Sequence, residues 1–253
     1  MMLSNKTKSI LVFLACLFMI TMNWLSSAWV FGGRTIEEVS RTSGEILVPA
    51  WFTFAIWGLI YLWMFIFSIY QLRKSTLHDS TIQEIRPWVA LNFIANWLWL
   101  PAATQSWRNP LTVLLIIFMW ISLGYINKAL QWYAKSKVTR RYIVMPMSIY
   151  FGWITIATPL NVAAVLNAYG FTDVVTTIPR VLFWISLAYV TSLVVFTKLR
   201  YLSYIAVTLW ALIWVIAVRQ YDAPQIAWIA VILWVAIITY IAVRAGKKRV
   251  LLQ

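Results

Sequence analysis

Eight long apolar stretches alternate with short polar segments along this chain. The stretches cover residues 9–31, 49–71, 87–106, 110–132, 142–167, 180–197, 201–218 and 224–243. A helix of ~20 apolar residues spans the ~30 Å hydrocarbon layer of a bilayer, whereas a barrel strand needs only ~10 residues of alternating polarity. Because these stretches are continuous, the pattern predicts an all-α, polytopic membrane protein with about eight transmembrane helices.

The ends of the apolar stretches carry helix-start signals. Pro49, Pro87, Pro110 and Pro224 stand at or near predicted starts, where a missing N–H costs little. The first stretch also resembles a signal peptide, with lysines before it and small residues at positions 26–28. Because it continues through residues 29–31 as Trp-Val-Phe, we favour a retained helix.

Composition agrees with a membrane location. The chain has 253 residues, of which 62% are hydrophobic and 11% charged, and its mean hydropathy is +0.79. A soluble domain is nearer half apolar and a quarter charged. The net charge of +14 does not indicate a nucleic-acid partner, because the basic residues recur between the apolar stretches instead of forming one patch.

The basic residues also predict the orientation. With eight crossings, the N-terminus, alternate loops and the C-terminal tail lie on one side and carry most of the 21 Lys and Arg residues. The other side carries the following arginines: Arg34, Arg41, Arg108, Arg180 and Arg219. Since cytoplasmic loops are richer in Lys and Arg, both termini are predicted to be cytoplasmic.

Residues for metal or acid–base chemistry are scarce. Cys16 and His78 are the single cysteine and histidine, so we expect no internal disulfide and no metal site. Lys128 and Lys198 lie near stretch ends, where long side chains reach the interface. Without Asp, Glu or His in the apolar stretches, we expect no proton pathway and no catalytic residues.

Tryptophan and asparagine are the candidate functional residues. The chain has 17 tryptophans, and Trp57, Trp63 and Trp153 lie mid-stretch. Indoles there either pack and form interfacial belts, or wall a flat apolar pocket. Asn92 and Asn96, four residues apart, share a helix face. They and the amide at position 161 either join helices or orient a ligand.

Three segments carry motifs of a known family. Residues 49–61 read PAWFTFAIWGLIY, residues 96–101 read NWLWLP after a Leu-Asn pair at 91–92, and residues 153–161 read WITIATPLN. In this order they resemble the tryptophan-rich sensory protein family, the bacterial and mitochondrial translocator proteins (TspO/MBR). The fixed positions of its patterns P-x-W-x5-W-[GT]-x2-Y, N-W-x-W and W-x3-A-T-x-L-N are all present.

The resemblance implies two parts. Residues 1–170 correspond to the family's five-helix bundle, and residues 175–253 add a three-helix extension with a basic cytoplasmic tail. Longer family members with such an extension are similar to this chain overall. The resemblance also implies a multi-pass protein of the cell membrane that contacts membrane lipids and forms homodimers in some members.

The resemblance further implies an apolar pocket that opens toward the loop after the first helix. Family ligands are tetrapyrroles, such as porphyrin and haem, and other small lipophilic molecules. No cofactor is obligatory. The motif positions assigned to ligand binding are Trp51, Trp57, Asn92, Asn96, Trp97, Trp99, Trp153, Ala157 and Asn161. Arg34 and Arg41 are expected at the pocket mouth, where they would meet ligand carboxylates.

Four functions remain open on the sequence. The leading interpretation is a sensor or handler of tetrapyrrole-like molecules. A transporter of a lipophilic substrate, a porphyrin-degrading enzyme and a purely structural protein whose extension docks a partner are the alternatives.

Overall fold

The computed structural model describes residues 3–27, 51–105, 109–131, 133, 136–171 and 178–246. These residues form helices and no strand. In chain order the elements are α1 (Asn5–Ser27), η1 (Trp51–Ala55), α3 (Ile56–Tyr70), α4 (Lys74–Leu77), α5 (Ser80–Gln105), α6 (Pro110–Leu130), α7 (Lys137–Thr139), η2 (Arg140–Val144), α8 (Met145–Ala168), α9 (Ile178–Leu199), α10 (Leu202–Asp222) and α11 (Pro224–Gly246).

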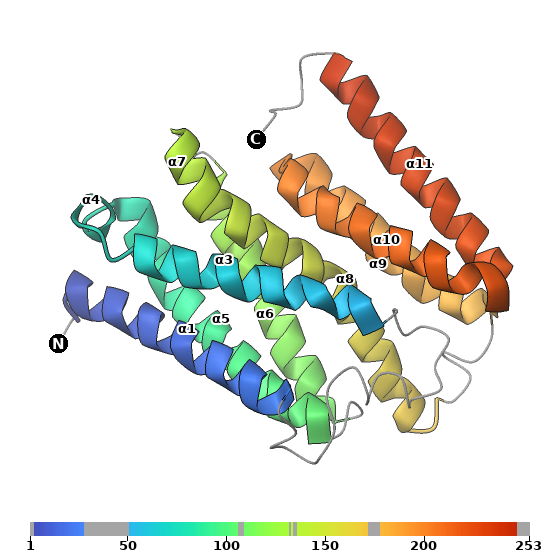
Figure 1. The fold of residues 1–253 in the computed structure, drawn as a ribbon, viewed down its shortest axis with the longest axis horizontal. Helices are drawn as coiled ribbons and strands as arrows, with labels where there is room; N and C mark the ends of the chain where they lie inside the picture. The colour runs from blue at the N-terminus through green and yellow to red at the C-terminus, as the bar shows by residue number, and fades with distance from the viewer. Residues whose placement is uncertain are drawn as a thin grey trace.

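The first five long helices pack as a closed ring. Each contacts two neighbours, in the order α1, α3, α8, α6, α5 and back to α1. Figure 1 shows them together as the blue to yellow part of the ribbon. Side chains that meet from helices not adjacent in this order, such as α3 and α5, therefore meet inside the ring.

The three remaining long helices lie on one side of the ring, against α8. Both α9 and α10 pack on α8, and α11 packs on α9 and α10 (Figure 1). In the apolar window of α8, 72% of residues are buried, against 22% for α11. α8 is apolar on all of its faces, as expected of a helix that is packed between α3, α6, α9 and α10.

A glycine allows α8 and α10 to approach closely. A Cβ built on Gly152 would lie 2.6 Å from the carbonyl oxygen of Tyr204 and 3.2 Å from Cβ of Val207. Small residues permit this kind of backbone approach between membrane helices. Gly152 is thus where the extension contacts the ring most closely among the described glycines.

The structure confirms a polytopic all-α membrane protein, with one helix less apolar than expected. Within the described ranges, seven helices are long and apolar enough to cross a membrane, and α5 is not among them. α5 has 26 residues and packs between α1 and α6 in the ring. Its polar first turns and its buried amides lower its hydropathy, and its place in the ring makes it the eighth long helix.

The interpretation of Pro87 as a helix-start residue is wrong. Pro87 lies inside α5, which begins at Ser80. The Asp79 side chain accepts a hydrogen bond from the backbone N–H of Ile82 (3.0 Å) and so caps the helix. The first helical residue, Ser80, therefore lies seven residues before the proline.

Arg86, in the polar first turns of α5, fixes this helix to the end of α3. Its side chain is 1% exposed. The guanidinium donates to Oε1 and the backbone carbonyl of Gln71 (2.9 and 3.1 Å), and to the carbonyls of Thr76 (3.0 Å) and Leu77 (2.9 Å). Nε2 of Gln71 donates in turn to the carbonyl of Ser9 on α1 (2.7 Å). One buried cation therefore joins α5, α4, α3 and α1.

Candidate functional site

Trp57 lies at the centre of a group of aromatic rings inside the five-helix ring, which we call the aromatic cluster. Its members are Phe54 from η1, Trp57 and Tyr61 from α3, Trp99 from α5, and Tyr150 and Trp153 from α8. All six side chains are buried. Helical spacing explains their convergence, because residues three or four apart share a helix face.

The rings of the aromatic cluster contact one another in both stacked and edge-on geometry. Trp57 stacks on Tyr61 with centroids 5.3 Å apart. The edges of Tyr150 and Trp153 meet Trp57 at 6.0 and 6.1 Å, and Trp99 lies tilted at 6.5 Å. These separations lie in the 4.5–7 Å range of favourable aromatic pairs. The cluster therefore presents large flat faces from three helices around one indole.

Asn96 is the polar centre beside these rings. Its Oδ1 accepts a hydrogen bond from the hydroxyl of Tyr61 (3.3 Å), and its Nδ2 donates to the hydroxyl of Tyr150 (2.9 Å). The Tyr150 hydroxyl lies 3.4 Å from Sδ of Met119 on α6. A single amide thus connects α3, α5 and α8 in the interior of the ring.

Asn161 is a second polar contact of the cluster. Its Oδ1 accepts from the indole N–H of Trp99 (3.3 Å), and its Nδ2 donates to Oγ1 of Thr112 on α6 (3.1 Å). The side chain is 0% exposed. This amide fixes the orientation of one of the four rings around Trp57.

Two buried donors at the cluster have no hydrogen-bond partner in the described part of the chain. They are the indole N–H of Trp153, whose side chain is 2% exposed, and the hydroxyl of Thr53, next to Phe54. An unpaired buried donor costs about 1–3 kcal/mol. A carbonyl or carboxylate oxygen of a bound molecule would satisfy the indole N–H.

Asn92 and Trp97 lie outside the aromatic cluster. The amide of Asn92 donates to the carbonyl of Met119 (3.1 Å) and to Oγ of Ser122 (2.7 Å), both on α6. Trp97 stacks on Phe18 of α1 with centroids 5.5 Å apart. The two residues join neighbouring helices of the ring, and the structure does not bring them to Trp57.

The remaining candidates are only partly described. Ala157 lies one turn after Trp153 on α8, half-buried against the core. Trp51 begins η1, but its side chain is outside the described residues. Arg34 and Arg41, expected at the pocket mouth, lie in a segment outside the described residues.

Two tyrosines of the cluster were not among the residues assigned from the sequence. Tyr61 is the last fixed position of the first motif and lies four residues after Trp57, so the motif and helical spacing together predict that it lies beside Trp57. Tyr150 precedes Trp153 by three residues and so shares its helix face. Tyr150 lies outside the three motifs, and its hydrogen bond to Asn96 joins residues that are far apart in the sequence, so no local pattern predicts its role.

No group of three or more His, Cys, Asp or Glu side chains capable of holding a metal ion occurs within the described ranges. His78 is exposed beyond α4, within 3.5 Å of the amide of Asn5, and Cys16 is buried on α1. The polar groups at the cluster are uncharged amides, hydroxyls and indole N–H groups.

Helices long and apolar enough to cross a membrane, packed around a buried interior of aromatic rings and amides, define a multi-pass α-helical membrane protein. A family model described as TSPO-like protein matches residues 9–243. The chain belongs to this TSPO-like family, and the match continues through α9, α10 and most of α11. No curated protein and no solved structure matches the chain.

Proposed function

We propose that this membrane protein binds a flat lipophilic ligand, a tetrapyrrole such as porphyrin or haem, at the aromatic cluster. The observation that carries the proposal is the convergence of four aromatic rings on Trp57 beside an unpartnered indole N–H of Trp153. Indole and phenol faces suit a planar macrocycle, and a few polar groups among apolar walls fix its orientation.

Ligand entry requires the rings to separate, because they contact one another. Phe54, on η1 just before α3, lies edge-on to Trp153 with centroids 6.0 Å apart. A movement of η1 away from α8 would open the cluster at this point. The hydroxyl of Thr53 and the indole N–H of Trp153 would then be available to acceptor atoms of the ligand.

Binding is proposed to rest on shape and not on iron ligation. The single histidine, His78, lies beyond α4 and not at the cluster. Metal-free protoporphyrin and haem should therefore bind with similar affinity. The role proposed is sensing or handling of the ligand, without catalysis, in a homodimeric protein with both termini in the cytoplasm.

The test is a titration of the purified full chain in detergent with protoporphyrin, with haem and with a planar sterol. We expect tryptophan fluorescence to be quenched to saturation at one protoporphyrin per chain, with haem within about threefold in affinity. Quenching that rises linearly with porphyrin and never saturates would mean partitioning into the micelle and would contradict the proposal.

Flux into proteoliposomes separates binding from transport. The proposal predicts saturable binding without saturable uptake of protoporphyrin into the vesicle interior. Saturable uptake would replace the sensor by the transporter alternative.

A further inference from the structure

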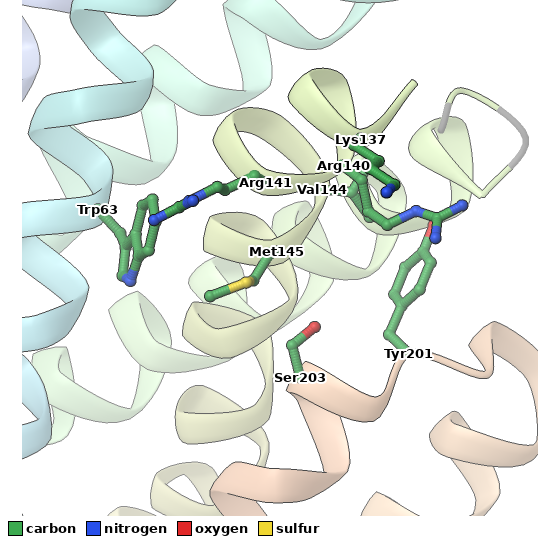
Figure 2. Close-up of a pocket in the computed structure, with 8 residues that line it drawn as sticks. All are labelled: Trp63, Lys137, Arg140, Arg141, Val144, Met145, Tyr201 and Ser203. Atoms are coloured by element: carbon green, nitrogen blue, oxygen red, sulfur yellow. The ribbon is translucent and has the colours of Figure 1, made fainter. Parts of the chain in front are cut away.

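A basic cavity lies between the middle of α3, the start of the helix comprising α7, η2 and α8, and the start of α10, and so between the ring and the extension. Its volume is about 370 Å³, within the range of roughly 300–1,000 Å³ typical of small-molecule pockets. We call it the basic cavity. Its lining residues are Trp63, Lys137, Arg140, Arg141, Val144, Met145, Tyr201 and Ser203 (Figure 2).

The charge of the lining favours an anion. Lys137, Arg140 and Arg141 contribute three cations, and the lining residues that the structure describes include no acidic side chain. Figure 2 shows Arg141 extending toward Trp63 and Arg140 toward Tyr201, so the two guanidinium groups flank the cavity. Guanidinium groups bind phosphate oxygens in a planar, bidentate geometry.

A π-helical turn positions these side chains. Arg140, Arg141 and Val144 belong to η2, a π-helix inserted between α7 and α8. Single π turns are rare, and they occur frequently at functional sites. The wider turn places two consecutive arginines and an apolar residue at one cavity, which a regular α-helical spacing would distribute differently.

The other walls are amphipathic. Trp63, Val144 and Met145 supply apolar surface, and Tyr201 and Ser203 line the cavity from the start of α10, where the Ser203 hydroxyl is hydrogen-bonded to the hydroxyl of Ser148 (2.5 Å). The hydroxyl of Tyr201 donates to the carbonyl of Asn127 (3.3 Å).

The location of the cavity matches the membrane–water boundary. Its basic side chains come from the start of the helix comprising α7, η2 and α8, on the side that carries most of the basic residues, and Trp63 lines it from the middle of α3. Leu62 and Ile69 on α3, on either side of Trp63 in the sequence, are exposed, as expected of residues that face lipid chains. Basic pockets between membrane helices bind anionic headgroups.

We infer that the basic cavity binds the phosphate group of an anionic phospholipid headgroup. The arginines of η2 and Lys137 contact the phosphate, and the acyl chains follow the outer surface of α3. Because Tyr201 and Ser203 come from α10, the site exists only with the three-helix extension in place. This binding is independent of the ligand proposed for the aromatic cluster.

The test compares two double variants of the full chain by native mass spectrometry during titration with phosphatidylglycerol or phosphatidylcholine. Lys137→Gln/Arg141→Gln removes two exposed cations from the cavity. Lys6→Gln/Lys74→Gln removes two exposed cations from the same end of the molecule, outside the cavity. We expect the first to weaken phosphatidylglycerol binding about tenfold, as for loss of charge-assisted hydrogen bonds, and the control to bind like wild type.

A third variant, Ser203→Phe, fills the cavity while all charges remain, and it should also weaken phosphatidylglycerol binding. Competition by inorganic phosphate or glycerol 3-phosphate would show that the phosphate group alone is recognised. Binding of the intact lipid only would show that the acyl chains are also required. Equal loss in the two double variants, or no preference of wild type for phosphatidylglycerol over phosphatidylcholine, would overturn the inference.

Discussion

The side-chain amide of Asn96 on α5 donates a 2.9 Å hydrogen bond to the hydroxyl of Tyr150 on α8, across the interior of the five-helix ring. The same amide accepts a hydrogen bond from Tyr61 on α3, so a small polar network connects three helices next to Trp57. Hydrogen bonds between membrane helices contribute ~1 kcal/mol each, because the alternative is an unsatisfied group in an apolar interior.

Replacing Asn96 by Leu should therefore destabilise the protein by about 1–2 kcal/mol, measured by thermal unfolding in detergent. Tyr150→Phe should cost less, because Asn96 keeps its bond from Tyr61. In a double-mutant cycle the two effects should be non-additive by ~1 kcal/mol. Additive losses would show that the bond between Asn96 and Tyr150 contributes nothing.

Trp153→Phe should leave the stability of the protein nearly unchanged. Phenylalanine retains an aromatic ring against Trp57 and removes an N–H that has no partner among the described residues. We expect little change in the unfolding temperature, whereas Trp153→Ala should cost about 3–5 kcal/mol. If Trp153→Phe destabilises as strongly as Trp153→Ala, the indole N–H is bonded in the folded protein.

Gly152→Ala should weaken the docking of the extension on the ring. The added Cβ would meet the backbone carbonyl of Tyr204 at 2.6 Å, and only movement of α10 can relieve that contact. We expect a loss of about 1–3 kcal/mol, the usual cost of overpacking.

Gly58→Ala on α3 is the matched control. Nothing lies within 4 Å of a Cβ at that position, so alanine should be neutral or stabilise the helix by ~0.5–1 kcal/mol. Unfolding temperatures that fall equally in both variants would mean that helix propensity, and not the approach of α8 to α10, governs the effect.

Arg86→Met should be among the most destabilising substitutions near the start of α5. It removes hydrogen bonds to Gln71, Thr76 and Leu77 and leaves buried carbonyls without a donor. A loss of at least ~3 kcal/mol is expected. Arg73→Gln removes an exposed guanidinium that lies over the ring of Tyr70, and should change stability by less than ~1 kcal/mol. Equal effects of the two would contradict a structural role for the Arg86 network.

The long helices could be predicted because continuous apolar stretches have one dominant physical explanation. The helix from α7 to α8 and the last three helices match the predicted stretches to within a few residues. The start of α5 was missed because its first turns are polar and a proline follows them. Asp79 supplies the cap there, and burial of Arg86 keeps the polar turn helical.

The candidate site was predictable only in part. Motif spacing identified Trp57, Trp99 and Trp153, which the structure brings together. Helical spacing also predicts that Asn92 and Asn96 share a face, yet Asn92 bonds to α6 while Asn96 bonds to α3 and α8. The four-residue step rotates the side chain by ~40°, and helix order in the ring, which sequence does not encode locally, decides which neighbour each amide meets.

The basic cavity also illustrates what sequence omits. Lys137, Arg140 and Arg141 are among the basic residues at the ends of the apolar stretches, and the sequence uses such residues only to predict the orientation. The structure places them on a π turn next to Tyr201 and Ser203, about 60 residues further along the chain. Such convergence depends on how α10 packs against α8, and hence on Gly152.

The most direct test of the account is protoporphyrin binding to two double variants that each lose two tryptophans. Trp57→Phe/Trp153→Phe alters the aromatic cluster, and Trp24→Phe/Trp228→Phe alters two side chains that are 67% and 68% exposed. We predict that the saturable quenching of tryptophan fluorescence weakens at least about tenfold in the first variant and stays as in wild type in the second. Identical titrations for wild type and both variants would contradict the placement of the ligand at the aromatic cluster.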